Sequence, residues 1–488
     1  MDSVCYIKQD IMGRDVIIVR LGEITVKGKS ARNKFEKILI SNMKDALKSE
    51  GYQFEIRREW GRIYVYAPRD SIDVLKRVFG IKSLSPAHEV EFNGLEDLLK
   101  KAEEFFADKI SKKVFAVEAR RSGVHEFTSI DVEKKLGEYL LKYGKGVDLE
   151  NPEVTAYVEV REKRAYFFTD IIYAYGGLPI GSEGKVVSLF SGGFDSAVAS
   201  WYLLRRGAKV HYVFCNLGGE AYKRAVLAVL KVLGDKWSYG YNPKLYVIPF
   251  SQILKKLREK TKRSYLNVLL KRYMYRAGEI IAQKVGAEAI VTGESLGQVS
   301  SQTLRNLYVS SLAIKMQIFR PLIGFDKDDI VKVAREIGTY EYSSLVKEYC
   351  GAFTVRPATH TNPKEIEEEE KKVGVDILYE AISNAEIIDV RKISLDEDVS
   401  TVDIETIPPG SLVVDLRPKE KYMKWHLKGS IHMDFDEVFE KPVRLDKNKT
   451  YVFLCDEGAL SREAAFFLRR LGYKAYSLKG GIKKLRRK

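Results

Sequence analysis

The chain has 488 residues, enough for three or four domains, and 45% of them are hydrophobic, enough for full-sized cores. It has no apolar run of about 18 residues and no basic-then-apolar leader, so we expect a cytoplasmic protein rather than a membrane or secreted one. Its net charge of +15 fits a polyanionic partner. The four cysteines form no C-x-x-C pair, which disfavours a zinc site: Cys5, Cys215, Cys350 and Cys455.

The amino-terminal third of the chain is predicted to mix strands and helices. Residues 1–75 have a β-α-β-β pattern, with a strand over 15–20, a helix over 31–50 and two strands around Phe54 and Tyr64. The block 76–175 adds two helices, 95–110 and 131–143, and three strands, 114–117, 155–158 and 165–168. The glycine-rich stretch 176–181 then predicts a hinge.

From residue 185 strand and helix patterns alternate regularly. The expected strands cover 186–190, 209–214, 245–249 and 288–292, with amphipathic helices between them. This alternation predicts a doubly wound parallel sheet, which binds ligands at the carboxyl ends of its strands.

The most informative motif is SGGFDS, residues 191–196, which lies between an apolar strand and a helix. Free backbone N–H groups and the positive end of the helix dipole make such a turn a phosphate cradle. Gly192 and Gly193 allow the backbone to approach a phosphate, and Asp195 offers a carboxylate for Mg²⁺ bound to pyrophosphate. An ordinary turn of small residues is the alternative, but the specified residues and their context argue against it.

A second motif, CDEGALSR, begins at Cys455 after an apolar strand and precedes a helix over 463–471. Loop N–H groups and a helix N-terminus there would stabilise an anionic sulfur. Six residues separate Cys455 from Arg462, one too many for a phosphatase loop, which favours a persulfide-carrying loop. The alternative is a buried core cysteine, the role that we expect for Cys215 and, as a structural residue, for Cys5.

Basic residues are unevenly distributed. Residues 1–180 are nearly neutral, with 31 Lys/Arg and 29 Asp/Glu, whereas 255–276 hold nine basic residues and one acid. Three tyrosines interleave with that charge and could stack on nucleic-acid bases: Tyr265, Tyr273 and Tyr275. A solvated helix face is the alternative. The last ten residues hold six basic residues and no acid, and we interpret them as a solubilising tail.

Taken together, these motifs resemble the tRNA 4-thiouridine synthetase family, the tRNA sulfurtransferases of the ThiI type, which are also tied to thiamine biosynthesis. The resemblance covers nearly the whole chain. Beyond the two motifs above, it rests on LGEITVKGK at 21–29, TGESLGQVSSQT at 292–303, RPLI at 320–323 followed by Asp326 and Lys327, and EYCG at 348–351.

The resemblance implies an α/β multidomain protein. Its expected parts are an α+β ferredoxin-like domain (1–75), a THUMP RNA-binding domain (76–175), a doubly wound PP-loop domain of the adenine-nucleotide α-hydrolase type (176–384) and a C-terminal α/β rhodanese domain (385–488). Many members lack the last domain, whereas this chain has it with its cysteine intact.

The resemblance also implies the site. Asp195 and Lys327 match positions needed for adenylation, Cys455 matches the persulfide carrier and Cys350 a second thiol that resolves a disulfide. ATP and Mg²⁺ are the implied cofactors, with no protein-built metal site. ATP-contacting positions correspond to Leu189, Phe190, Ser191, Gly192, Gly193, Ser196, Lys271, Gly293 and Gln302.

The expected function is ATP-dependent transfer of sulfur from a cysteine persulfide to a tRNA uridine, giving 4-thiouridine. A cysteine desulfurase would supply the sulfur, a reductant would open a Cys350–Cys455 disulfide, and a homodimer is possible. One alternative is a sulfur donor to a small sulfur-carrier protein for thiazole synthesis. Another is an RNA-binding protein with vestigial catalytic domains, which the intact motifs disfavour. The 2-thiolating tRNA enzymes are a rival that the 292–303 stretch disfavours.

Overall fold

The computed structural model describes residues 13–394, except 27, 60, 345 and 347–356, and residues 402–486, except 418, 441–444 and 457. The chain divides into two units, one of residues 1–182 with 205–207 and one of residues 183–204 with 208–488. Within the described residues no helix is long and apolar enough to cross a membrane.

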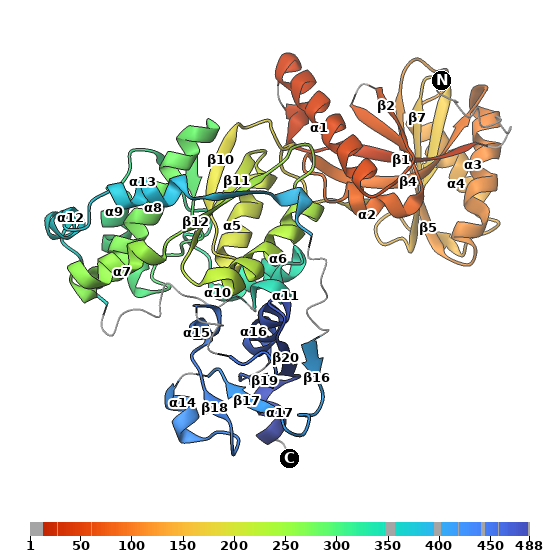
Figure 1. Ribbon diagram of the computed structural model, residues 1–488. Helices are drawn as coiled ribbons and strands as arrows, with labels where there is room; N and C mark the ends of the chain where they lie inside the picture. The colour runs from red at the N-terminus through yellow and green to blue at the C-terminus, as the bar shows by residue number, and fades with distance from the viewer. Residues whose placement is uncertain are drawn as a thin grey trace, which may run out of the picture. The chain divides into compact units, whose positions relative to one another are not determined.

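The first unit is built on one nine-stranded sheet (Figure 1). Its strands run in the order β2-β3-β1-β4-β8-β7-β5-β6, and β9 pairs with β4. The strands are β1 (Arg14–Leu21), β2 (Glu55–Glu59), β3 (Arg62–Tyr66), β4 (Ile81–Glu91), β5 (Val114–Ser122), β6 (Gly146–Val147), β7 (Val154–Arg161), β8 (Arg164–Phe168) and β9 (Ile172–Tyr173). The helices are α1 (Lys29–Ser49), α2 (Ile72–Leu75), α3 (Gly94–Ile110) and α4 (Ser129–Leu140).

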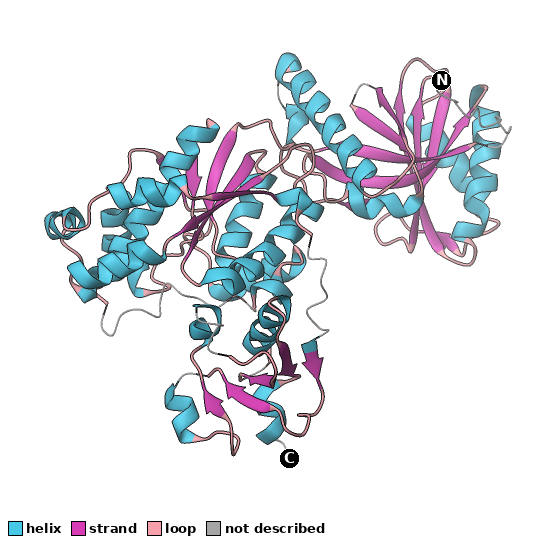
Figure 2. Cartoon of the chain, in the orientation of Figure 1, coloured by secondary structure: helices cyan, strands magenta, loops and turns pink. Residues whose placement is uncertain are grey.

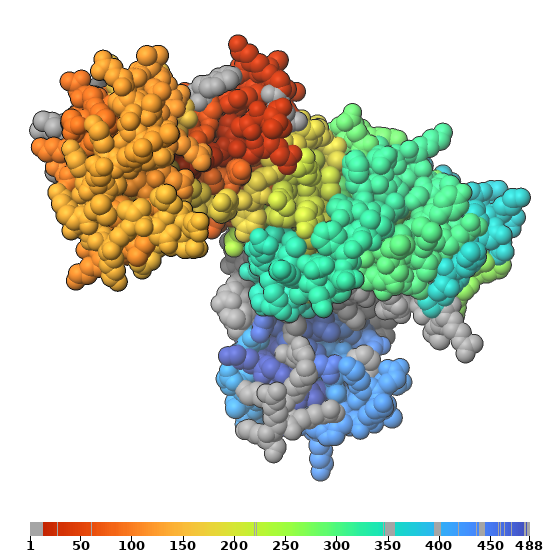
Figure 3. Space-filling view, turned by 180° about the vertical axis from the view of Figure 1, so that it is seen from behind, coloured from red at the N-terminus to blue at the C-terminus, as the bar shows by residue number. Residues whose placement is uncertain are grey.

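Strand β4 joins the two blocks expected at 1–75 and 76–175. It pairs antiparallel with β1 on one side and with β8 on the other, so both blocks share a single sheet. The stacked rings of Tyr64 and Tyr166, with centroids 4.6 Å apart, also connect the two blocks. In the space-filling view both blocks, red and orange, contribute to the surface of this unit (Figure 3). No strand was predicted at residues 81–91.

The second unit contains a six-stranded sheet in the order β14-β13-β10-β11-β12-β15. Its first five strands are parallel, and helices lie on both faces (Figure 2). The strands are β10 (Lys185–Leu189), β11 (Lys209–Asn216), β12 (Lys244–Pro249), β13 (Ala289–Val291), β14 (Gln317–Phe319) and β15 (Glu386–Asp389). The helices are α5 (Phe194–Arg205), α6 (Gly219–Trp237), α7 (Ser251–Lys260), α8 (Leu266–Val285), α9 (Leu304–Ser311), α10 (Lys327–Glu336), α11 (Tyr340–Ser343), α12 (Pro363–Lys371) and α13 (Asp376–Ser383). The predicted doubly wound topology is confirmed.

The antiparallel strand β15 continues this sheet beyond residue 384, the predicted end of the PP-loop domain. It pairs with β12, and Lys244 binds Asp389 across the pair at 3.0 Å. The sheet therefore ends near residue 389, because this short strand completes its edge.

The last part of the chain forms a separate parallel sheet in the order β16-β20-β19-β17-β18. Its strands are β16 (Asp403–Ile404), β17 (Leu412–Asp415), β18 (Ile431–His432), β19 (Thr450–Leu454) and β20 (Lys474–Leu478). Its helices are α14 (Lys419–Lys424), α15 (Phe435–Glu440), α16 (Ala459–Arg470) and α17 (Gly481–Arg486).

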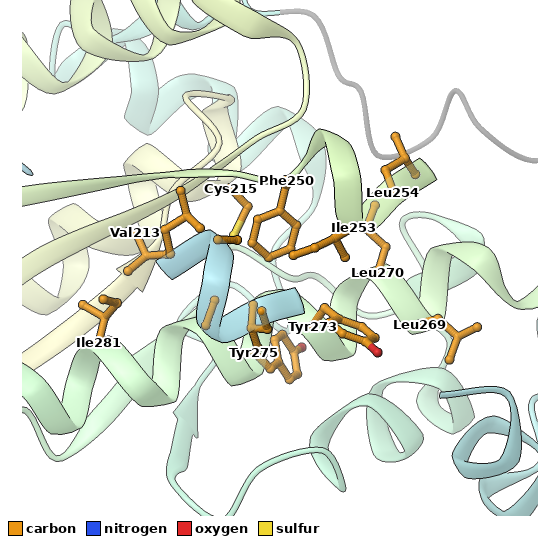
Figure 4. Packing of buried hydrophobic residues seen from close by; sticks show 14 of the residues in the cluster. Val213, Cys215, Phe250, Ile253, Leu254, Leu269, Leu270, Tyr273, Tyr275 and Ile281 are labelled. Atoms are coloured by element: carbon orange, nitrogen blue, oxygen red, sulfur yellow. The ribbon is translucent and has the colours of Figure 1, made fainter. Parts of the chain in front are cut away.

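Helix α8 packs into the main core of the nucleotide-domain sheet, and this corrects the predicted stacking role of its tyrosines. Tyr273 and Tyr275 are at most 1% exposed and lie among the buried side chains around Phe250 and Cys215 (Figure 4). Rings in a core cannot stack on nucleic-acid bases. Cys215 is buried, as predicted, and Cys5 lies outside the described residues.

Candidate active site

A cavity of about 460 Å³ lies at the carboxyl ends of β10 and β13. These neighbouring strands lead to opposite sides of the sheet, because β11 and β12 continue one way and β14 the other. Parallel sheets bind their ligands at such a reversal of strand order. The cavity is therefore where the topology predicts it, and its size is in the range of small-molecule sites.

The SGGFDS turn forms one wall of this cavity. Ser196 Oγ donates to Gly193 O at 3.0 Å and accepts from the backbone N–H of Ser191 at 3.3 Å, which closes the turn onto the start of α5. Gly192 has φ of +80°, and a side chain there would also crowd Val226. Glycine is therefore needed on both conformational and steric grounds.

Gly293, just beyond β13, lets that strand's end pack against the same turn. A Cβ atom at residue 293 would lie 2.5 Å from the backbone carbon of Asp195 and 2.7 Å from the backbone nitrogen of Ser196. Any side chain would push the first turn of α5 away from β13. The two motifs that the sequence linked to ATP, at 191–196 and 292–303, thus meet across one backbone contact.

Two predicted catalytic residues, 132 positions apart, form an ion pair. Lys327 Nζ lies 2.8 Å from Asp195 Oδ1, and Gln298 Nε2 donates to Asp195 Oδ2 at 3.2 Å. The Lys327 side chain is 41% exposed, whereas that of Asp195 is 19% exposed. Lys327 is the first residue of α10, and its cation reaches back to the phosphate turn from a separate helix.

A buried carboxylate without a predicted role lies in the wall of the cavity. Glu294 is bound by Lys271 Nζ at 2.6 Å and by Arg320 Nε at 2.8 Å. Tyr275 Oη and Thr292 Oγ1 donate to it as well, at 2.6 and 2.9 Å. Burial alone would raise the pKa of Glu294, but the two cations outweigh it and lower the pKa to about 2. The carboxylate is therefore ionised and fixes the position of Lys271.

Most of the residues predicted to contact ATP line the cavity: Leu189, Ser191, Gly193, Ser196, Lys271, Gly293 and Gln302. Phe190 and Gly192 do not. Phe190 is 2% exposed and packs edge-on against Tyr212, and Gly192 faces Val226. Lining residues that the sequence analysis missed include Tyr222 and Gln298. Gln298 lay inside the 292–303 motif, so that motif was a usable signal for it.

A second constellation surrounds Cys455 at the carboxyl end of β19. Its sulfur accepts the backbone N–H of Gly458 at 3.1 Å and lies 3.5 Å from Ser461 Oγ. Gly458 has φ of +99° and is the N-cap residue of α16, so the loop turns sharply under the sulfur. Cys455 is 4% exposed. This is the predicted strand, loop and helix cradle, with backbone N–H donation to sulfur.

The arginine that ends the CDEGALSR motif pairs with a carboxylate on another strand. Arg462 Nη2 lies 2.6 Å from Asp403 Oδ2 on β16, so its charge is paired away from the cysteine. A second charged pair near the loop, Asp415 with Arg417, is buried, with Arg417 Nη2 2.8 Å from Asp415 Oδ2. The prediction for Cys350 lies outside the described residues.

The basic segment 255–276 divides into an exposed part and a buried part. Lys255 and Lys256 are exposed on α7. Arg272 is 2% exposed and binds Glu370 at 2.8 Å, inside the acidic run of α12. The α7 portion and the exposed Arg263 that follows it therefore offer charge to a partner, whereas the basic residues of the α8 portion are paired with Glu294 and Glu370 within the fold.

Comparison with known proteins identifies the architecture. A family model described as thiamine biosynthesis protein (ThiI) matches residues 181–375, and models of the ThiI ferredoxin-like domain, the THUMP domain and the rhodanese-like domain match 16–85, 92–170 and 402–488. A tRNA sulfurtransferase of Pyrobaculum aerophilum is 43% identical over 95% of this chain and 96% of its own length. The chain belongs to the tRNA sulfurtransferase (ThiI) family.

Other members of the ThiI family match a shorter part of the chain. A probable tRNA sulfurtransferase of Saccharolobus solfataricus is 44% identical over 77% of this chain and all of its own length. A crystal structure described as a 4-thiouridine synthetase–RNA complex with bound ATP is 34% identical, with a TM-score of 0.69, over 77% of this chain and 99% of its own. The predicted family, fold class and enzyme class are confirmed.

Proposed function

We propose that this enzyme transfers sulfur from a persulfide on Cys455 to a uridine of tRNA, giving 4-thiouridine at the expense of ATP. The observation that carries the proposal is the meeting of Asp195, Lys327 and Gly293 at one phosphate turn, in a chain that also cradles a cysteine sulfur. The relatives named tRNA sulfurtransferase, and the 4-thiouridine synthetase with RNA and ATP, support it.

The cavity would hold the nucleotide, with its phosphates at the turn 191–196. Backbone N–H groups of the turn and the N-terminus of α5 would bind phosphate oxygens. Lys327 would leave Asp195 to neutralise charge that develops when uracil O4 attacks the α-phosphate and pyrophosphate departs. Lys271, held by Glu294, would supply a second fixed cation at the cavity wall.

Asp195 is the residue suited to Mg²⁺. The described residues contain no group of three His, Cys, Asp or Glu side chains that could hold a metal by themselves. One carboxylate together with nucleotide phosphates is, however, a usual way to bind Mg²⁺. Mg²⁺ bound there would stabilise the departing pyrophosphate.

Sulfur transfer would then use the two cysteines. The terminal sulfur of the Cys455 persulfide attacks C4, AMP leaves, and sulfur bridges Cys455 and the base. A Cys350 thiolate attacks the Cys455 sulfur and breaks the sulfur–sulfur bond, which releases 4-thiouridine and leaves a Cys350–Cys455 disulfide. A dithiol reductant restores both thiols, and a cysteine desulfurase reloads Cys455.

The test of this function is mass analysis of nucleosides from tRNA incubated with the protein, ATP, Mg²⁺, a cysteine desulfurase, cysteine and a dithiol reductant. 4-Thiouridine should form only when ATP is present, with one pyrophosphate released for each thiolated base. If sulfur appears instead at C2 of uracil, or without ATP consumption, the proposal is wrong.

A second candidate is sulfur donation to a small carrier protein for thiazole synthesis, favoured by the family model's description as a thiamine biosynthesis protein. It would need the loop of Cys455 but neither the nucleotide cavity nor RNA. Sulfur transfer from Cys455 to a carrier protein whose C-terminal carboxylate is supplied already adenylated, so that AMP leaves, with a dithiol reductant and without tRNA or added ATP, would distinguish it.

The attack of Cys350 on the Cys455 sulfur, the resolution step, makes a separate prediction. After a single turnover without reductant, peptide mapping should find Cys350 joined to Cys455. A disulfide needs Cα atoms within about 7 Å, so the two thiols, 105 residues apart in sequence, must be brought together during the reaction. Cys350→Ala should allow at most one sulfur transfer per enzyme. Product formation in the wild type without the cross-linked peptide would exclude this step.

The exposed portion of α7 predicts a contribution to RNA binding. Charge reversal at Lys255, Lys256 and Arg258 should weaken tRNA binding and flatten its salt dependence, because each lost phosphate contact removes about 0.7–0.9 from the log–log slope. The slope is measured by titrating tRNA at several salt concentrations. A slope equal to that of the wild type would leave α7 as a solvated helix face.

A further inference from the structure

The cysteine loop lies next to a strongly basic segment that no step above uses. Residues 417–428 hold five basic residues and one acid, Glu420. Lys419, Lys424 and Lys428 are exposed, and none of the three forms an ion pair with a carboxylate of a described residue. The segment begins where β17 ends, and the N–H of Leu416 donates to Leu454 O, at the foot of the cysteine loop, at 2.8 Å.

A side-chain contact ties this segment to the cysteine loop itself. Lys421 Nζ lies 2.7 Å from Asp456 Oδ2, the residue that follows the cysteine. The acid that follows the cysteine is thus paired with a lysine of α14. Lys419, Lys424 and Lys428 lie within seven residues of that lysine in sequence and add exposed positive charge to the same segment.

The start of helix α17 also lies against the cysteine loop. The N–H of Ile482 donates to Cys455 O at 2.9 Å, and a side chain at Gly481 would collide with that oxygen. The start of α17 therefore packs against the cysteine loop, and the last ten residues carry six basic residues and no acid. The start of α17 and the segment 417–428 therefore both contact the cysteine loop.

Exposed apolar side chains accompany the charge. Met423, in α14, is 70% exposed, and Trp425, directly after α14, is 37% exposed. Lysines interleaved with an exposed indole are a composition suited to RNA, because phosphates meet the charges and a base can stack on the ring.

We propose that this surface, residues 419–428 with the start of α17, is an RNA-contact surface that guides Cys455 to the tRNA. The inference rests on the proposed function, in which a sulfur on Cys455 reaches a base of a polyanion. A cysteine desulfurase and tRNA must both approach this cysteine. Of the two, tRNA is the one whose negative charge is known to complement the surface. The rhodanese-like domain, which carries the sulfur, then contributes to RNA binding together with other parts of the chain.

The test compares two triple variants of the full chain with equal changes in charge. The first is Lys419→Glu, Lys424→Glu and Lys428→Glu. The control is Lys447→Glu, Lys449→Glu and Lys474→Glu, which lie at the amino ends of β19 and β20, the edge of the sheet opposite to Cys455. For each variant, the measurements are tRNA affinity against salt concentration, persulfide loading of Cys455 by a cysteine desulfurase, and thiolation of tRNA.

The first variant should lower the salt slope of tRNA binding by about 2–3, the sum for three lost phosphate contacts, while Cys455 is loaded as in the wild type. Loading also reports that the domain is folded. The control should keep the wild-type slope. An unchanged slope, an equal change in the control, or lost loading with an unchanged slope would overturn the proposal, and the last would make this a protein-docking surface. The slope needs no sulfur transfer, so a failure of the proposed function would show separately, as absent 4-thiouridine in the wild type.

Discussion

Replacing Glu294 with glutamine should destabilise the nucleotide domain and reduce adenylation on the order of 100-fold. The neutral amide leaves Lys271 and Arg320 without the buried charge that both contact, and breaking such a pair costs about 3–5 kcal/mol. A Lys271 side chain that is no longer fixed loses its position at the cavity wall, and small misplacements cost about this much in rate. Thermal unfolding and ATP-dependent pyrophosphate release with tRNA measure the two effects.

Two further variants test whether the loss of the buried charge causes both effects. Glu368→Gln, on the exposed face of α12, should leave both stability and rate unchanged. The double variant Lys271→Met with Glu294→Gln should be more stable than Glu294→Gln alone, because one uncompensated cation is gone. Equal stability of the single and double variants would contradict the ion-pair explanation, and wild-type affinity for ATP in Glu294→Gln would contradict its positioning role.

The same residue predicts a pH dependence. The pKa of Glu294 falls from 4.5 to about 2 in the folded chain, so its ionisation stabilises the fold above pH 4.5. This contribution, about 3 kcal/mol, is lost as pH falls from 4.5 to about 2. The difference in unfolding temperature between the wild type and Glu294→Gln should therefore shrink across that range.

Replacing Cys455 with serine should abolish sulfur transfer from a persulfide donor. Serine keeps a hydrogen-bond acceptor for the N–H of Gly458, so the loop is retained, but an oxygen cannot carry the transferable sulfur. Pyrophosphate release with tRNA should continue, because the nucleotide cavity does not include the residue. Thiolation driven by free sulfide should survive, because sulfide bypasses the carrier.

The matched control is Cys215→Ala, a second buried cysteine that lies in the core of the nucleotide domain. It should retain donor-dependent transfer. Both variants are assayed by mass analysis of tRNA nucleosides and by detection of persulfide on the protein. Full donor-dependent turnover by Cys455→Ser would remove the cysteine loop from the mechanism, and equal loss in Cys215→Ala would indicate a general folding defect.

Local sequence pattern by itself determined the two cradles. A strand followed by a Gly/Ser turn and a helix specifies both the loop at 191–196 and that at Cys455, because every group involved lies within a few residues. Strand and helix alternation likewise determined the doubly wound sheet and hence the edge at which the cavity lies. The 292–303 motif was recognisable, but its closeness to the phosphate turn was not.

The tertiary structure decided which distant side chains meet. The ion pair of Asp195 with Lys327 spans 132 residues, and the buried role of Glu294 depends on α8 and on the segment after β14 arriving together. Packing also reversed one prediction, because Tyr273 and Tyr275 carry the same sequence signal whether they face solvent or the core. Charge, spacing and local pattern therefore predicted the chemistry, while burial and long-range pairing depend on how the helices pack onto the sheet.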